Sequence, residues 1–319
     1  MNEHFMSTAN DQTMFFNEIL MGLKETPKRV SPKFLYDQRG SELFGKICEL
    51  QEYYITRAEN KILKAYAHEM SRLIGPNSVI IEPGSGNAEK VMHLLLRLNR
   101  VKGYVPIDIS GTSLSYLVKT IQQRIPKLEV TPIKQDFTKI TELPQIVKNE
   151  TGKKVIFIPG STLGNLSPEE MQKLMNDYIQ MCGNQVSFLV GMDLKKDPSR
   201  LQLAYDDSQG VTASFNLNLL TRLNRDFGAR FNLTEFYHKA FYNEEEGRVE
   251  MHLVSKIDQT VVIKGEEISL MKGETIHTES SYKYSIDEFC SICAELRLKL
   301  RKYWKDPENM FCMYYFEKE

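Results

Sequence analysis

The chain has 319 residues, enough for one large domain or two with ample hydrophobic cores. Its 41 Lys and Arg residues balance 42 Asp and Glu residues, and the formal net charge of -1 argues against a nucleic-acid partner. Apolar runs such as 155–158 and 186–190 are too short to span a membrane, and residues 1–17 lack the apolar core of a signal peptide. We therefore expect a cytoplasmic protein that acts on a small molecule. We also expect a monomer, although the sequence does not determine the oligomeric state.

The first informative segment is 79–87, VIIEPGSGN, in which an apolar run ends on Glu82 and opens into a glycine turn. Residues 78–81 are predicted to form a buried strand, and residues 88–98 carry apolar side chains at helical spacing. Glycine permits a positive φ and lets a ligand approach the backbone closely. A ligand site at this turn is favoured over a plain connection between a strand and a helix.

The sequence of the turn argues against two common kinds of nucleotide-binding site. Glu89 stands where a dinucleotide-binding fingerprint needs its third glycine, and the segment does not follow the phosphate-loop pattern G-x-x-x-x-G-K-[ST]. The pattern Glu82-x-Gly84-x-Gly86 instead resembles the first motif of class I S-adenosylmethionine-dependent methyltransferases.

Strands and helices then alternate along the chain. Strands are predicted at 101–107, 129–134, 154–158 and 185–190, and helices at 114–124 and 168–181. The second helix begins with a capping box, because Ser167 precedes Pro168 and Glu170 lies three residues after the cap. This order predicts an α/β fold with a doubly wound, mostly parallel sheet, which binds ligands at the carboxyl ends of its strands.

The alternation stops within 195–284. This stretch contains a helical segment at 213–226 and strand-like segments at 236–242, 249–257 and 259–263, and it is predicted to be an α+β insertion. A helix at 286–295 and strands at 296–303 and 310–316 then predict an antiparallel C-terminal hairpin, as in class I methyltransferases. We expect a methyltransferase domain over 58–194 and 285–319, and a substrate-binding domain over 1–57 and 195–284.

The five cysteines lie at 48, 182, 290, 293 and 312, an odd number whose spacing does not suggest a disulfide framework. Cys290 and Cys293 have the spacing of a redox or zinc motif, but they lie in a predicted helix without a second pair or a His at metal-ligand spacing. Buried helical thiols are the favoured interpretation. The six histidines are dispersed and form no H-E-x-x-H motif, so we expect no metal site.

Candidate contacts for an S-adenosylmethionine cofactor follow the predicted strands. Asp108 lies 24 positions after Gly84, where a carboxylate can accept both ribose hydroxyls, or alternatively cap the following helix. Asp136 and Phe137 offer a carboxylate for an exocyclic amine and a ring for an adenine face, although a purely structural role suits them too. Lys90 could reach the methionine carboxylate or be solvated.

The segment 157–166, FIPGSTLGNL, covers the end of the fourth strand and the loop after it. Asn165 carries two donors and an acceptor, so its side chain could hold an amine and a carboxylate together. A capped loop between a strand and a helix is an equal alternative, because Ser167 and Pro168 follow.

Six segments carry a closer resemblance. They are 31–44 (SPKFLYDQRGSELF), 52–57 (EYYITR), 160–165 (GSTLGN), 193–197 (DLKKD), 204–207 (AYDD) and 276–281 (IHTESS), in order over nearly the whole chain. Together they resemble the histidine-specific S-adenosylmethionine-dependent methyltransferases. The resemblance implies methylation of the α-amino group of L-histidine to Nα,Nα,Nα-trimethylhistidine, the first step of ergothioneine biosynthesis.

The resemblance also implies roles for single residues. Asn165 and Tyr205 would hold the amino and carboxylate groups of the substrate, and Tyr53 and Tyr36 would lie close to the same amino acid. From the needs of the chemistry, we expect the hydroxyl of Tyr36 or Tyr53 to orient the amine as a catalytic group. The residues implied to bind the imidazole are Glu279, Ser281 and Met251. The residues implied to bind S-adenosylmethionine are Gly84, Gly86, Lys90, Asp108, Asp136 and Phe137.

Other interpretations compete with these roles. The chain has 15 tyrosines, Met251 lies in an apolar strand, and residues 279–284 alternate as an edge strand would. Two other functions compete as well, namely methylation of another aromatic amino acid or an indole amine, and non-catalytic binding of S-adenosylmethionine. Glu279 and Ser281 argue against an indole, and motifs at both sites argue against a non-catalytic protein.

Overall fold

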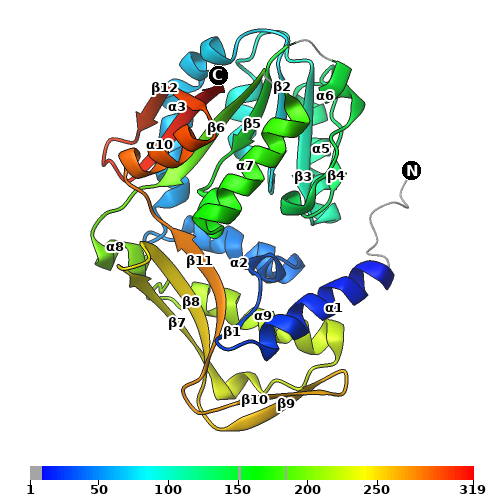
Figure 1. Cartoon of the computed structure of the whole chain (residues 1–319), viewed down its shortest axis with the longest axis vertical. Helices are drawn as coiled ribbons and strands as arrows, with labels where there is room; N and C mark the ends of the chain where they lie inside the picture. The colour runs from blue at the N-terminus through cyan, green and yellow to red at the C-terminus, as the bar shows by residue number, and fades with distance from the viewer. Residues whose placement is uncertain (1–8, 150–151, 184) are drawn as a thin grey trace. The chain divides into compact units, whose positions relative to one another are not determined.

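The structure, a computed structural model, describes residues 9–149, 152–183 and 185–319. These residues form two compact units, and Figure 1 labels most of their helices and strands. Unit 1 comprises Ile55–Lys195 and Lys283–Glu319, and unit 2 comprises residues 9–54 and Lys196–Tyr282. The internal domain bounds expected from the sequence differ from these by at most three residues.

Unit 1 is built on a seven-stranded sheet with the order β12-β13-β6-β5-β2-β3-β4. Its strands are β2 (Val79–Pro83), β3 (Gly103–Asp108), β4 (Ile133–Lys134), β5 (Lys154–Ile158), β6 (Val186–Asp193), β12 (Leu298–Lys305) and β13 (Phe311–Lys318). Strands β2 to β6 pair in parallel, whereas β13 is antiparallel to both β6 and β12. This order confirms the doubly wound sheet and the C-terminal hairpin.

Helices cover both faces of this sheet. They are α3 (Ile55–Ile74), α4 (Glu89–Leu95), α5 (Gly111–Arg124), α6 (Gln145–Asn149), α7 (Pro168–Cys182) and α10 (Ile286–Glu295). Helix α3 packs with α4 on one face, and α7 packs with α10 on the other, in front of the sheet in Figure 1. Every residue of β2, β5 and β6 is buried, as expected for strands covered on both faces. Among the described residues, no helix combines the length and the hydropathy of a membrane span.

The structure differs from the sequence predictions at three places in unit 1. The helix expected at 88–98 ends at Leu95. The strand expected at 129–134 is reduced to β4, and Val130 forms only an isolated bridge with Tyr104. Strand β6 continues beyond the predicted end at residue 190, because Gly191 pairs with Met313 of β13 instead of starting a turn.

Unit 2 combines a four-stranded sheet, a separate hairpin and helices. The sheet has the order β1-β11-β8-β7, with β1 (Lys28–Arg29), β7 (Phe236–Asn243), β8 (Arg248–Ser255) and β11 (Thr275–Tyr282). The hairpin joins β9 (Gln259–Ile263) to β10 (Glu266–Leu270). The helices are α1 (Ala9–Lys24), α2 (Gln38–Glu49), α8 (Pro198–Leu203) and α9 (Val211–Phe227). Strands β10 and β11 and the N-terminal helices were not predicted.

Asp37 ties the N-terminal part of unit 2 to its inserted part. Its side chain caps α2 by accepting a hydrogen bond from the Gly40 amide at 2.7 Å. It also accepts from Asn218 at 2.8 Å and pairs with Arg225 at 2.9 Å, both on α9. Burial acts to raise the pKa of Asp37, but these hydrogen bonds outweigh it and the pKa lies below its usual value. Two segments far apart in sequence are thereby held together.

A buried ion pair lies in unit 1 where the chain returns to it. The Lys283 ammonium lies 3.0 Å from the Asp193 carboxylate, and both side chains are 0% exposed. A parallel bridge between Leu194 and Tyr284 continues the contact along the backbone. Because each charge is removed from water, the two are tolerated only together.

We expect Lys283→Met to lower the free energy of unfolding by about 3–5 kcal/mol, because it removes the ammonium that pairs with a buried carboxylate. Lys195→Met is the matched control, since Lys195 pairs with Glu288 at side-chain exposures of 40% and 46%. That exposed pair should contribute about 0–1 kcal/mol. Urea unfolding followed by circular dichroism measures both, and equal effects would contradict the structural role of Lys283.

Candidate functional site

The glycine turn after β2 is held against β3. The amides of Gly84 and Ser85 donate to the Ile107 carbonyl at 2.8 and 3.1 Å. Gly84 and Gly86 have φ values of 69° and 53°, which disfavour any side chain. A Cβ on Gly86 would meet no atom within 4 Å, so space for a ligand is open on that side of the turn.

Asp108 lies against this turn at the end of β3. One carboxylate oxygen accepts from the Gly86 amide at 3.0 Å, and the other accepts from the Ser110 amide at 2.8 Å. Burial raises the pKa of Asp108 above its usual value. Ser110 is the residue that caps α5, so the alternative that Asp108 merely caps this helix is wrong.

Asp136 and Phe137 lie at the end of β4, and Phe137 reaches the glycine turn. Asp136 accepts hydrogen bonds from the amide and the hydroxyl of Thr138 at 3.0 and 2.6 Å, so it does have a structural capping role. The ring of Phe137 is half-buried, and it would lie 3.4 Å from a Cβ on Gly84. An aromatic face is therefore available beside the turn.

Lys90 is not a solvated side chain. Its ammonium lies 2.6 Å from a carboxylate oxygen of Glu59, and the two side chains are 22% and 0% exposed. The sequence analysis missed Glu59. The sequence holds one indication that Glu59 is buried. It lies next to Ala58 and three residues before Ile62, on the face of α3 that carries the apolar side chains.

The loop after β5 has an unusual backbone. Gly160 and Ser161 have φ values of 76° and 59°, and the left-handed conformation is uncommon for serine. The Ser161 hydroxyl accepts from the Asp193 amide at 3.1 Å, and the Thr162 hydroxyl donates to the Pro159 carbonyl at 2.7 Å. A short 3-10 helix, Thr162–Asn165, follows and ends on a half-buried Asn165.

Glu82, the acid of the first motif, is uncharged at neutral pH. Its side chain is 1% exposed and accepts a hydrogen bond from the Tyr104 hydroxyl. Burial raises the pKa of Glu82 to about 8, and the hydrogen bond from Tyr104 and the nearby ammonium of Lys90 offset this only in part. The acid therefore acts as a neutral hydrogen-bonding group below the turn.

All but one of the residues expected to bind substrate lie in unit 2 and come together there, whereas Asn165 belongs to unit 1. The Tyr205 hydroxyl donates to the Ser281 hydroxyl oxygen at 2.7 Å, and both side chains are buried. The Tyr205 ring packs edge-on against Tyr53 with centroids 6.4 Å apart. Phe44, which the sequence analysis did not assign, packs edge-on against Tyr36 at 5.5 Å and Tyr53 at 6.0 Å. The result is an aromatic cluster beside two hydroxyl groups.

A β-bulge decides which side chains join this cluster. His277 pairs with His252 across β11 and β8, but after the register shift Glu279 pairs with Met251. Because successive residues of β8 point to opposite faces, Glu279 shares the face of Met251 and His277 does not. Strand β1 pairs with β11 only at Ile276 and His277, so residues 279–282 pair with β8 alone, as an edge strand would.

Burial shifts the pKa of two groups in or beside this cluster, Tyr53 and His238. Burial, with a smaller effect of Tyr205, raises the pKa of Tyr53 well above its usual value, so its phenol keeps its proton. His238 lies 2.9 Å from the Tyr205 carbonyl through Nε2 and 2.9 Å from Asn216 through Nδ1. Burial lowers the pKa of His238, and a neutral imidazole that donates from Nε2 and accepts at Nδ1 satisfies both contacts.

On the opposite face, the structure groups histidines that the sequence analysis described as dispersed. Glu250, His252 and His277 each offer a ligand atom within 4.8 Å of the others. Glu250 already accepts from Arg248 at 2.8 Å and contacts His252 at 2.9 Å, while Ser280 contacts His277 at 3.0 Å. A cation would have to compete with the Arg248 guanidinium, so we interpret the cluster as a hydrogen-bonded network.

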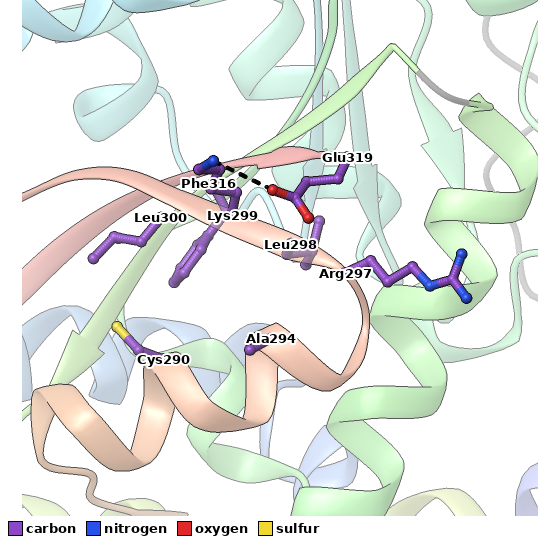
Figure 2. Close-up of a pocket in the computed structure, with 8 residues that line it drawn as sticks. All are labelled: Cys290, Ala294, Arg297, Leu298, Lys299, Leu300, Phe316 and Glu319. Atoms are coloured by element: carbon purple, nitrogen blue, oxygen red, sulfur yellow. Dashed lines mark ion pairs between the residues drawn. The ribbon is translucent and has the colours of Figure 1, made fainter.

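A depression between α10 and β12 lies apart from the candidate residues of unit 1. It is lined by Cys290, Ala294, Arg297, Leu298, Lys299, Leu300, Phe316 and Glu319, and Figure 2 shows the ion pair of Lys299 with Glu319, 3.4 Å apart. Cys290 is half-buried there, whereas Cys293 is fully buried, and burial raises the pKa of both thiols. Both are free cysteines in a helix, but the expectation of buried thiols is confirmed only for Cys293.

We expect Glu82→Gln to flatten the pH dependence of stability. The folded pKa of about 8 lies above the reference value of 4.5, so Glu82 stabilises the fold at low pH and loses that contribution as the pH rises through about 8. Relative to wild type, the variant should gain on the order of 1–3 kcal/mol between about pH 6 and about pH 9.

Thermal unfolding across this pH range measures the effect. Glu142→Gln is the control, because hydrogen bonding to Lys148 lowers the pKa of that exposed carboxyl and it does not titrate in this range. If the stability of Glu82→Gln changes with pH as steeply as that of the wild-type protein, the interpretation that Glu82 is neutral is wrong.

Known proteins resemble this chain over nearly its whole length. A family model described as histidine-specific methyltransferase, SAM-dependent, matches residues 15–318. The histidine N-alpha-methyltransferases of Mycolicibacterium smegmatis and Mycobacterium tuberculosis are 33% and 35% identical to it, each over 92% of both chains. A 4-dimethylallyltryptophan N-methyltransferase of Epichloe festucae var. lolii is 26% identical over 90% of both chains. With its class I sheet and its glycine turn, the chain belongs to the histidine-specific S-adenosylmethionine-dependent methyltransferases.

Proposed function

We propose that this enzyme transfers methyl groups from S-adenosylmethionine to the α-amino nitrogen of L-histidine, giving Nα,Nα,Nα-trimethylhistidine for ergothioneine biosynthesis. The observation that carries the proposal is the buried Glu279 carboxylate on the same face as the hydrogen-bonded pair Tyr205 and Ser281. Two relatives named as histidine N-alpha-methyltransferases support it. The cytoplasmic location and monomeric state expected from the sequence stay predictions.

The proposed cofactor site lies in unit 1. The Asp108 carboxylate, held at the glycine turn, would accept the ribose hydroxyls, and the half-buried Phe137 ring would cover an adenine face. Lys90 would bind the methionine carboxylate. The proposed cofactor residues are Gly84, Gly86, Lys90, Asp108, Asp136 and Phe137.

The proposed imidazole site lies in unit 2. A neutral imidazole has one N–H donor and one nitrogen acceptor, which match the carboxylate of Glu279 and the hydroxyl of Ser281. An indole has a donor but no such acceptor, so it would leave one polar group unsatisfied in a buried site. Met251, opposite Glu279 in the register, would pack on the ring. Tyr205 would hold the amino-acid end of the substrate, and the role expected for Asn165 of unit 1 stays a prediction.

The chemistry requires alignment more than acid-base catalysis, because the sulfonium is already activated. Alignment of the amine with the methyl group can contribute several kcal/mol, roughly 7–11 in the best cases. Since burial keeps the Tyr53 phenol protonated, we propose that Tyr53 and Tyr36 accept N–H bonds and direct the lone pair of the amine, while protons leave through water. S-adenosylmethionine supplies the methyl group.

A second candidate is methylation of another aromatic amino acid or an indole amine, which the tryptophan-type relative favours. Incubation with labelled S-adenosylmethionine and a panel of histidine, tryptophan, tyrosine, phenylalanine and tryptamine distinguishes the two. We expect label in histidine only, with mass shifts for up to three methyl groups. Transfer to a non-histidine acceptor alone would overturn the proposal, and no transfer at all would favour a non-catalytic role.

We expect Glu279→Gln and Ser281→Ala each to raise the KM for histidine by roughly tenfold or more, because each removes a charge-assisted or buried hydrogen bond of about 1.5–3 kcal/mol. Ser280→Ala is the matched control on the same strand. The Ser280 hydroxyl contacts His277 at 3.0 Å on the opposite face, so its loss should leave the KM unchanged. A wild-type KM for Glu279→Gln would refute the assignment of the imidazole site.

A further inference from the structure

We propose that Glu59 is a positioning residue of the cofactor site, which holds the Lys90 ammonium and the Gly160 amide in place for the amino-acid end of S-adenosylmethionine. The inference rests on the proposed cofactor site, because it gives Lys90 its ligand. Glu59 touches neither of the reacting atoms. Its effect on binding is exerted through Lys90.

One carboxylate links three elements of unit 1. Glu59 lies on α3, and its side chain is 0% exposed. One oxygen lies 2.6 Å from the Lys90 ammonium on α4. The Gly160 amide, in the loop after β5, donates to the two carboxylate oxygens at 2.8 and 3.0 Å. Helix α4, which follows the glycine turn, and the loop after β5 are therefore held in place by the same side chain.

Two glycines leave room for this arrangement. A Cβ on Gly191 of β6 would lie 2.3 Å from a Glu59 oxygen, and a Cβ on Gly160 would lie 2.9 Å from the Lys90 nitrogen. Gly191 continues its strand with a φ outside the left-handed region, so only the lack of a side chain explains glycine there. A Cβ on Gly191 would also lie 2.9 Å from the Phe311 ring, so the space beside β6 is filled by that ring and the Glu59 carboxylate together.

Stability alone does not account for the pair. Burying two charges is costly, and apolar side chains of similar volume often stabilise a fold as well or better. An apolar residue at 59 would fit the buried face of α3, where Ile55, Ile62 and Leu63 lie. We therefore attribute the pair to the placement of Lys90.

Placement matters because lysine is flexible. A lysine carries its ammonium on a four-carbon stem and loses rotamer freedom when it binds a ligand. The ion pair with Glu59 fixes the ammonium beforehand, and a group with three donors can still bind a ligand carboxylate. A contact of Asn60 with Glu89 at 2.9 Å holds α3 to α4 beside the pair.

The test uses Glu59→Gln in the full-length protein. Glutamine keeps the shape and can accept from the Gly160 amide, but it removes the charge that orients Lys90. We expect the Kd for S-adenosylhomocysteine, measured by isothermal titration calorimetry, to rise about tenfold or more. The KM for S-adenosylmethionine should rise likewise, while kcat at saturating cofactor and the KM for histidine stay within about threefold of wild type.

Glu69→Gln is the matched control on the same helix. Glu69 accepts from the Trp304 indole at 2.9 Å and makes no contact with the candidate cofactor residues among those described. Its Kd should stay at the wild-type value. A purely structural role of Glu59 would lower kcat through loss of active protein and leave the Kd unchanged, and a wild-type Kd for folded Glu59→Gln would overturn the proposal.

A double variant tests whether Glu59 acts through Lys90. In a Lys90→Met background, Glu59→Gln should change the Kd by less than about twofold, because the partner it orients is gone. If the two substitutions raise the Kd independently, so that their fold-changes multiply in the double variant, the proposal is overturned. If Glu59→Gln does not fold, the Lys90→Met variant alone decides. A wild-type Kd for that variant would show that Lys90 does not bind the cofactor, and Glu59 would then have no group to position. Binding of S-adenosylhomocysteine needs no acceptor, so failure to methylate histidine would refute the proposed function and leave this inference intact.

Discussion

The fold of unit 1 is constrained by three buried acidic side chains, because each of them needs a hydrogen-bond or ion-pair partner. Glu59, Glu82 and Asp193 are each at most 1% exposed, and each lies in or next to the strands that end at the candidate site. Such groups are tolerated only with specific partners. The partners differ: an ammonium and an amide for Glu59, a phenol for Glu82, and an ammonium for Asp193. Each partner comes from another element, so satisfying the acids also fixes the loops that would bind a cofactor.

In unit 2, strand register places the substrate candidates of β8 and β11. Without the irregularity after His277, residues 277 and 279 would lie two apart on one face of β11. The bulge moves Glu279 to the face of Met251, and it leaves His277 with the network of Glu250 and His252. One inserted residue thus separates a buried carboxylate that can select an imidazole from two imidazoles that already have partners.

Local patterns were enough to predict the sheet of unit 1, its glycine turn and the capping box of α7, because strand runs, glycines and caps act over a few residues. Contacts between distant segments were not predictable in this way. Glu59 meets Gly160 across 101 positions, and the chain around each residue shows no sign of the other. The pairing of β11 with β8, the bulge and the histidine cluster likewise arise from register between strands, which a single sequence does not specify. The family resemblance supplied the substrate residues, and periodicity did not.

The two glutamates near Lys90 have different partners. Glu82 has a neutral phenol as its hydrogen-bond partner, and burial raises its pKa to about 8. Glu59 forms the ion pair with Lys90 and adds a repulsion that raises the pKa of Glu82 further. If both acids were ionised, Lys90 would be shared between two carboxylates and its ammonium would be less defined. A neutral Glu82 leaves one strong partner, so the direction in which Lys90 presents its charge to a ligand follows from the position of Glu59.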